Sequence, residues 1–211
     1  TELAVFDFLM TGSVGNIDIA SGLQFRDESF DIARGASSIA KFDAAGNITE
    51  PADLLFLGGG LESTASRNAT ALFIEGSMNP SDRLEVKGAL RYEDLESDSS
   101  VDPKIAFRYQ ASDELALRAS FSTSFREASL AQLTSTNISL QGIQDYNADG
   151  SAKGGTAFIR IAQANNPNLA PEESDNMNIG AIWNPTDKLS MKLDYWAIDY
   201  TNVITIESAQ G

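Results

Sequence analysis

The sequence predicts an all-β chain built from antiparallel strands. Three observations support this prediction: apolar and polar residues alternate with a period of two, tight polar turns connect the alternating segments, and helical spacing is rare. Alternation of this kind places apolar side chains on one face of a strand and polar side chains on the other. Each expected strand therefore separates an apolar from a polar environment.

The clearest alternation runs from residue 83 to residue 93. One face carries Leu84, Val86, Gly88, Leu90 and Tyr92, and the other carries Glu85, Lys87, Ala89, Arg91 and Glu93. The same division recurs at 104–110, 114–121 and 189–195, with weaker copies at 17–25, 69–78 and 177–183. A polar turn at 12–16 implies one further strand before it.

Short turns and longer loops alternate along the chain. Tight turns are expected at 79–82, 111–113 and 184–187 as well as at 12–16, and loops at about 32–68, 94–100 and 126–172. Eight strands, four turns and three loops follow from this division. Outer-membrane barrels have short turns on the periplasmic side and longer loops outside. The order therefore predicts an antiparallel up-and-down transmembrane β-barrel.

Aromatic residues are expected near strand ends, where they would form girdles at the two membrane interfaces. The residues concerned are Tyr92, Tyr109, Phe121, Trp183, Tyr195, Trp196 and Tyr200. A soluble antiparallel sandwich with core aromatics is the alternative, because its solvent face could also hold the charged side chains.

Composition excludes several classes of function. Histidine and cysteine are absent, which removes thiol nucleophiles, Cys/His zinc sites and histidine bases. Acidic residues outnumber basic ones by 30 to 15, and a net charge of -15 argues against nucleic-acid binding. Carboxylates such as Glu172 with Glu173, or Asp194 with Asp199, could suggest a glycosidase pair, but nothing in the sequence defines a cleft around them. We expect no enzymatic activity and no cofactor.

Two runs resemble a known family. LEVKGALRYEDLESDSSVDPKIAFRYQASDELALRASFSTSFREASLAQL, at 84–133, and NPNLAPEESDNMNIGAIWNPTDKLSMKLDYWAIDYTNVI, at 166–204, are similar in order and content to the barrel of TonB-dependent outer-membrane receptors. The chain departs from the family at 123–128, where TSFREA stands in place of the frequent Thr-Gly-Phe-Arg-Ala-Pro. A different bend is expected there.

The resemblance implies a fragment of a larger plugged barrel, because such transporters have roughly 22 strands. Residues 1–211 are then expected to form an incomplete barrel of about eight strands, without the plug domain or the C-terminal strands. The implied function is import of a scarce solute, such as a siderophore, cobalamin or an oligosaccharide, across the cell outer membrane of a Gram-negative bacterium. The implied partners are the TonB complex through the missing plug, outer-membrane lipid and lipopolysaccharide. A passive β-rich envelope or secreted adhesion protein is the alternative.

Five basic residues on the polar faces are the candidate functional residues. We expect them to face the lumen and to line the solute path or contact acidic plug residues: Lys87, Arg91, Lys104, Arg108 and Arg118. The competing interpretation pairs them with Glu85, Glu93, Glu114 and Asp194 only to keep the lumen polar.

One further segment has partial calcium-loop spacing. Residues 145–150, DYNADG, open like an EF-hand loop, but Thr156 stands at the twelfth position, where a bidentate Glu is needed. We therefore predict a turn-rich surface loop at 145–150 and no metal site.

Overall fold

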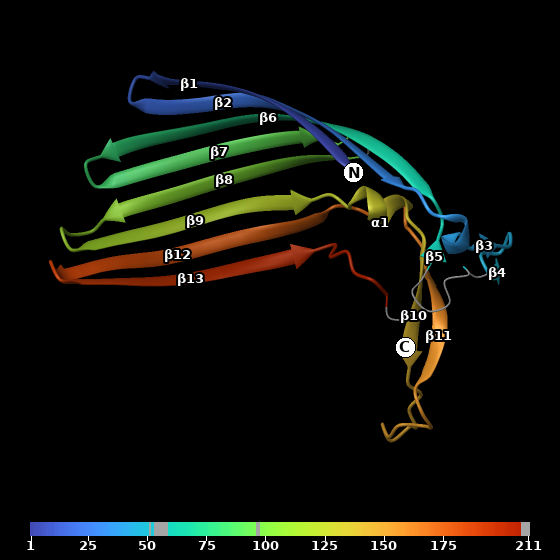
Figure 1. The fold of residues 1–211 in the computed structure, drawn as a ribbon. Helices are drawn as coiled ribbons and strands as arrows, with labels where there is room; N and C mark the ends of the chain where they lie inside the picture. Colours follow the sequence, from blue (N-terminus) through green and yellow to red (C-terminus); the bar gives the residue numbers. More distant parts are fainter. Residues whose placement is uncertain (51, 53–58, 96–97, 208–211) are drawn as a thin grey trace.

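The computed structural model describes residues 1–50, 52, 59–95 and 98–207. Parts of two predicted loops, at 51, 53–58 and 96–97, lie outside the described residues. The described chain is nearly all β, and it contains one curved eight-stranded antiparallel sheet (Figure 1).

The strands of this sheet follow one another in chain order. They are β1 (Glu2–Val14), β2 (Ile17–Ile32), β6 (Ser63–Ser81), β7 (Leu84–Asp94), β8 (Ser99–Gln110), β9 (Leu115–Arg126), β12 (Glu172–Thr186) and β13 (Leu189–Thr201). Every neighbouring pair is antiparallel. The predicted eight-stranded, up-and-down arrangement is confirmed.

The predicted turns lie at one end of the sheet, where they join successive strands (Figure 1). Gly15 begins the β1–β2 turn with a φ of +63°, a conformation that costs glycine little because it has no Cβ. The turns at 79–82 and 184–187 are tighter than expected, since β6 and β12 continue to Ser81 and Thr186. A register shift follows Met78 and Trp183 in these two strands, at the Asn-Pro pair that each contains. Proline has no N–H to give to the ladder, so a bulge at this position is physically reasonable.

The expectation of two long irregular loops is only partly correct. β6 begins at Ser63, inside the predicted 32–68 loop, which also holds η1 (Ala36–Ser38), β3 (Lys41–Phe42), β4 (Ile48–Glu50) and β5 (Gly59–Gly60). The 126–172 loop holds α1 (Leu130–Thr134), β10 (Asn137–Ile143) and β11 (Ala157–Gln163). Strands β11, β10 and β5 form a three-stranded sheet that descends steeply from the loop end of the main strands (Figure 1).

The two faces of the main sheet differ in chemistry. The apolar face carries rows of residues in register across the strands, such as Phe8, Leu23, Leu72, Tyr92 and Val101. Many of its side chains are exposed, including Leu72 at 54% and Ile179 at 53%. The buried apolar residues are mainly small or lie at the loop end, among them Leu95, Ala128, Leu130 and Ile138. The sheet therefore does not bury its apolar face within this chain.

The prediction that the aromatics lie at strand ends is partly wrong. Tyr92, Tyr109, Trp183 and Tyr200 are close to the ends of their strands. Phe121 lies in the middle of β9, and Tyr195 and Trp196 lie in the middle of β13. The reason is strand length, because β9 and β13 continue several residues beyond the alternating segments that marked them in the sequence.

Candidate functional site

The candidate site is the polar face, defined here as the face of the main sheet that carries the five predicted basic residues. Cross-strand register and alternation place Lys87, Arg91, Lys104, Arg108 and Arg118 on this one face. Three hollows lie along it, with volumes of about 630, 730 and 500 Å³. The five residues share one face, and both their orientation toward a lumen and their role in solute passage stay predictions.

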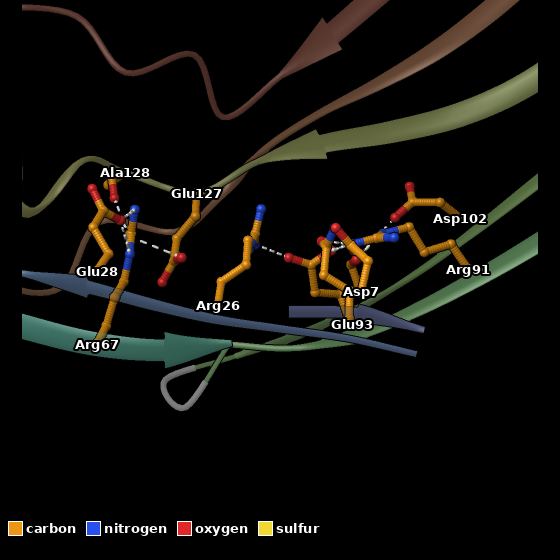
Figure 2. Close-up of polar contacts among 11 residues, drawn as sticks. Asp7, Arg26, Glu28, Arg67, Arg91, Glu93, Asp102, Glu127 and Ala128 are labelled. Atoms are coloured by element: carbon orange, nitrogen blue, oxygen red, sulfur yellow. Dashed lines mark hydrogen bonds and ion pairs between the residues drawn. The ribbon is translucent and has the colours of Figure 1, made fainter. Parts of the chain in front are cut away.

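The strongest electrostatic feature is a carboxylate shared by two guanidinium groups. Glu93 is 2% exposed and forms ion pairs with Arg26 of β2 and Arg91 of β7 (Figure 2). The Arg91 Nη2–Glu93 Oε2 distance is 2.6 Å, and the same Nη2 donates to Gln24 Oε1 at 2.9 Å. Burying a carboxylate is costly unless it is paired, and these two ion pairs offset the cost of burying Glu93.

A second cluster connects strands that are not neighbours in the sheet. Arg67 of β6 contacts Glu28 of β2 at 2.7 Å and Glu127, just after β9, at 2.9 Å (Figure 2). Its Nη1 also donates to the carbonyl oxygen of Ala128 at 2.6 Å. Strands β7 and β8 lie between β6 and β9 in the sheet order. The segment after β9 therefore reaches across the β7–β8 hairpin to meet Arg67.

The geometry of β6 makes this crossing possible. β6 pairs with β7 only from Thr70 to Ser81, so residues 63–69 extend beyond the end of β7. Helix α1 packs against both β6 and β2. Ser129 begins α1 with a capping box, in which its hydroxyl accepts from the backbone N–H of Gln132 and its own N–H donates to the Gln132 side chain. We call residues 127–134 the strap.

Sequence reasoning missed Arg26 and Arg67. The sequence pattern places Arg67 in the predicted 32–68 loop and leaves Arg26 just beyond the alternating segment 17–25, whereas the structure places both in strands. The sequence does contain a signal for Arg67. Counted in steps of two along β6, Arg67, Ala69 and Ala71 fall on the same face as the polar residues further along the strand. Extending the alternation backward by a few residues would have included Arg67 on the polar face.

The other predicted basic residues differ in their partners. Lys87 pairs with Glu85 at 2.9 Å, and Arg118 holds Asp194 with Nη2–Oδ1 and Nε–Oδ1 distances of 2.5 and 2.9 Å. Arg108 lies opposite Arg118 in the register and donates to Gln110 at 3.0 Å.

Only some of the predicted basic residues form ion pairs with the four acidic residues expected as their partners. Glu85, Glu93 and Asp194 each have a basic partner. Within the described part of the chain, neither Lys104 nor the predicted acid Glu114 forms an ion pair. Lys104 lines the 730 Å³ hollow together with Lys87, Glu75 and Asp18.

The polar face of β9, β12 and β13 is uncharged over three consecutive rows. We call these nine positions the neutral strip: Ser120, Asn178 and Trp196 form one row, Ser122, Asn176 and Ile198 the next, and Ser124, Ser174 and Tyr200 the third. The Ser124 and Ser174 hydroxyls are 2.8 Å apart, and Asn176 Nδ2 donates to each at 3.2 Å. Nothing in the one-dimensional pattern had singled out this set.

The 145–150 segment is a turn held by its own side chains. A bridge between Tyr146 and Ala152 closes it, and Asp149 Oδ1 accepts hydrogen bonds from the N–H and hydroxyl of Ser151 at 2.9 and 2.6 Å. These bonds lower the pKa of the Asp149 carboxyl. Across the residues that the structure describes, no group of three or more His, Cys, Asp or Glu side chains is arranged to hold a metal. None of the described helices has the length and apolar character needed to cross a membrane.

The sequence profile described as TonB dependent receptor-like, beta-barrel, matches residues 3–211. The chain belongs to this family. The match covers both quoted runs and also residues 3–83, which neither run includes. A comparison with curated proteins finds no match.

Solved structures of similar fold include a ferric enterobactin receptor and two siderophore receptors. The ferric enterobactin receptor PfeA of Pseudomonas aeruginosa, in complex with BCV-L6, has a TM-score of 0.67 and 19% identity over 94% of this chain and 26% of its own. PirA from Acinetobacter baumannii gives 0.66 and 18% over 94% and 27%, and PirA from Pseudomonas aeruginosa gives 0.64 and 14% over 94% and 32%. At these identities the likeness establishes the fold. The chain spans between a quarter and a third of the length of these structures.

Proposed function

We propose that this chain is part of the wall of an outer-membrane receptor that binds a scarce small solute and imports it with energy transmitted by TonB. The observation that carries the proposal is the division of one curved sheet into an exposed apolar face and a hollowed, ion-paired polar face. Family membership favours a receptor over a passive adhesin with the same alternation.

The apolar face suits contact with lipid. In water, exposing rows of Leu, Ile and Phe would cost about 25 cal/mol for each Å² of apolar surface. Side chains such as Leu72, Ile74 and Phe121 are 54%, 52% and 44% exposed on this face. The hydrocarbon core of an outer membrane, with lipopolysaccharide in its outer leaflet, would remove that cost.

The polar face suits a lumen. Its charges are largely balanced in pairs, as at Glu93 and Asp194, so it can remain hydrated without a strong net field. In receptors of this family a plug occupies the lumen and carries the TonB contact, and we place Lys87, Arg91, Lys104, Arg108 and Arg118 toward that space. No step of this function requires a cofactor, a bond-breaking residue or nucleic acid.

The test uses the complete receptor that contains this chain, in its own bacterium. Solutes remaining in the medium are measured by mass spectrometry after growth of the parent strain, a receptor deletion strain and a TonB-deficient strain. We expect at least one small solute to stay in the medium in both mutant strains and to disappear with the parent. Equal depletion by all three strains, or recovery of the receptor outside the outer-membrane fraction, would contradict the proposal.

A further inference from the structure

The neutral strip differs from the rest of the polar face in charge and in aromatic content. We infer that it is a binding track for a neutral, hydroxyl-rich solute, an oligosaccharide, with Trp196 and Tyr200 as stacking platforms. The inference rests on the proposed function, because it names the class of solute that the receptor takes.

Trp196 and Tyr200 lie on the polar face of the sheet. Asp194 lies on the polar face, where Arg118 holds it. No register irregularity occurs between β12 and β13 over residues 189–201, apart from the bulge at the turn. Alternation therefore places Trp196 and Tyr200 on the same face as Asp194. They are 68% and 59% exposed on β13, which is the last strand of the sheet and is mostly exposed on both faces.

The row of Trp196 also carries polar side chains that are available for hydrogen bonding. Hydroxyl and amide groups both donate and accept, as sugar hydroxyls do. Within the described residues, the side chains of Ser120 and Asn178 make no hydrogen bond, although both lie in the row of Trp196. Adjacent strands are about 4.8 Å apart, so this row presents a ring and two unfilled hydrogen-bonding groups within roughly 10 Å. A pyranose has the matching surface, with a C–H face for the ring and hydroxyl edges for the polar groups.

The neutral strip lies between two ion pairs. Arg118 and Asp194 form the ion pair that borders the strip toward the turn end of the sheet. Arg126 and Glu172, 2.5 Å apart, form the ion pair that borders it toward the loop end. Each cation is already neutralised by its partner, and no strip position is charged. An anionic ligand would therefore find no uncompensated cation here, and the chain as a whole is strongly acidic.

A cavity with a largely uncharged, amide-rich lining lies beyond the loop end of the strip. Its volume is about 630 Å³, a usual size for a small-molecule site. Glu207 is its one charged lining residue in the described part, and its amides are Gln132, Asn137, Gln141, Gln163 and Asn166. Ser135, also in its lining, is 5% exposed and has a hydroxyl with no hydrogen-bond partner among the described residues.

Cavity and strip are joined by a short connection. The Glu172 carboxylate accepts the backbone N–H of Ile204 at 2.7 Å, and Ile204 lines the cavity. This hydrogen bond holds the segment after β13 close to the loop end of the strip. A solute leaving the cavity would therefore meet the Tyr200 row first and the Trp196 row next.

The test measures binding by isothermal titration to the complete purified receptor in detergent. The probes are maltohexaose, cellohexaose and xylohexaose as neutral oligosaccharides, ferric enterobactin as an anionic chelate, and a neutral hexapeptide. We expect at least one oligosaccharide to bind, and Trp196→Ala to weaken that binding at least tenfold. Tyr195→Ala is the matched control, because it removes an aromatic from the same strand on the opposite face, and it should change affinity less than twofold.

The outcomes separate this inference from the proposed function. Binding of ferric enterobactin or the peptide with no oligosaccharide binding would overturn the inference while leaving the importer intact. Equal oligosaccharide affinity in Trp196→Ala and the parent receptor would also overturn it, provided that both proteins show the same thermal unfolding. Failure of the strain comparison described above would remove the importer as well.

Discussion

Arg118 of β9 and Asp194 of β13 form a two-pronged ion pair that passes over Gly180 of β12. A Cβ added at Gly180 would lie 2.2 Å from Asp194 Oδ1 and 2.8 Å from Arg118 Nε. The glycine therefore opens the space through which two strands, separated by a third, are joined on the polar face.

The first prediction concerns this pair. In the parent receptor, a double-mutant cycle of Arg118→Ala and Asp194→Ala should give a coupling of roughly 0.5–1 kcal/mol, since both side chains are partly exposed. In a Gly180→Ala background the coupling should fall to near zero, because the methyl group displaces both partners. Denaturant unfolding measures each corner of the cycle. An unchanged coupling in the Gly180→Ala background would show that the pair does not depend on the glycine.

The second prediction concerns the buried carboxylate. Glu93→Gln should lower the free energy of unfolding by about 3 kcal/mol, because it leaves Arg26 and Arg91 without their shared counter-charge. Glu85→Gln is the control, since Glu85 pairs with the exposed Lys87 and should cost at most about 0.5 kcal/mol. Urea unfolding of the complete receptor in detergent gives both values. Similar losses for the two variants would contradict the burial argument.

The third prediction concerns the strap at 127–134. Arg67→Ala removes the contacts to Glu28, Glu127 and the Ala128 carbonyl. We expect amide hydrogen exchange in the strap to become at least tenfold faster, with little change in β9 itself. Arg108→Ala serves as the control, because Arg108 contacts Gln110 on its own strand. Exchange in the strap that stays at the parent rate would show that α1 packing alone holds it.

The fourth prediction concerns pH. Hydrogen bonds from the Asn47 side chain and backbone, with smaller contributions from Ala45 and Gly46, lower the pKa of the Asp43 carboxyl. A lowered pKa means that the charged form stabilises the 43–47 turn above the ordinary carboxyl pKa, and that this contribution is lost as the pH falls through the lowered value. Protection of the Ala45 and Asn47 amides should therefore be higher at about pH 6 than at about pH 3. Asp43→Asn should show low protection at both values, and equal protection in the parent receptor would contradict the assignment.

Much of the fold could be predicted from the sequence because strand alternation is a local property. Seven of the eight strands contain enough period-two residues to identify them without their neighbours, and the first strand is implied by the turn that follows it. Proline, glycine and aspartate mark the turns. The lengths of the strands were harder to predict from the sequence. β13 extends to Thr201 through mixed residues, so Trp196 was expected in a girdle and instead lies in the middle of the strand.

The candidate site depended on information that the alternation does not contain. The sequence by itself determined that Arg91, Lys104 and Arg118 belong to polar positions, because parity within one strand decides the face. Only the tertiary structure decided that Glu93 is shared with Arg26, that Arg67 meets Glu127 across a hairpin, and that Trp196 stands beside Asn178 and Ser120. These relationships depend on strand register and on the path of a loop. Both are set by contacts between residues far apart in the chain, which no local pattern encodes.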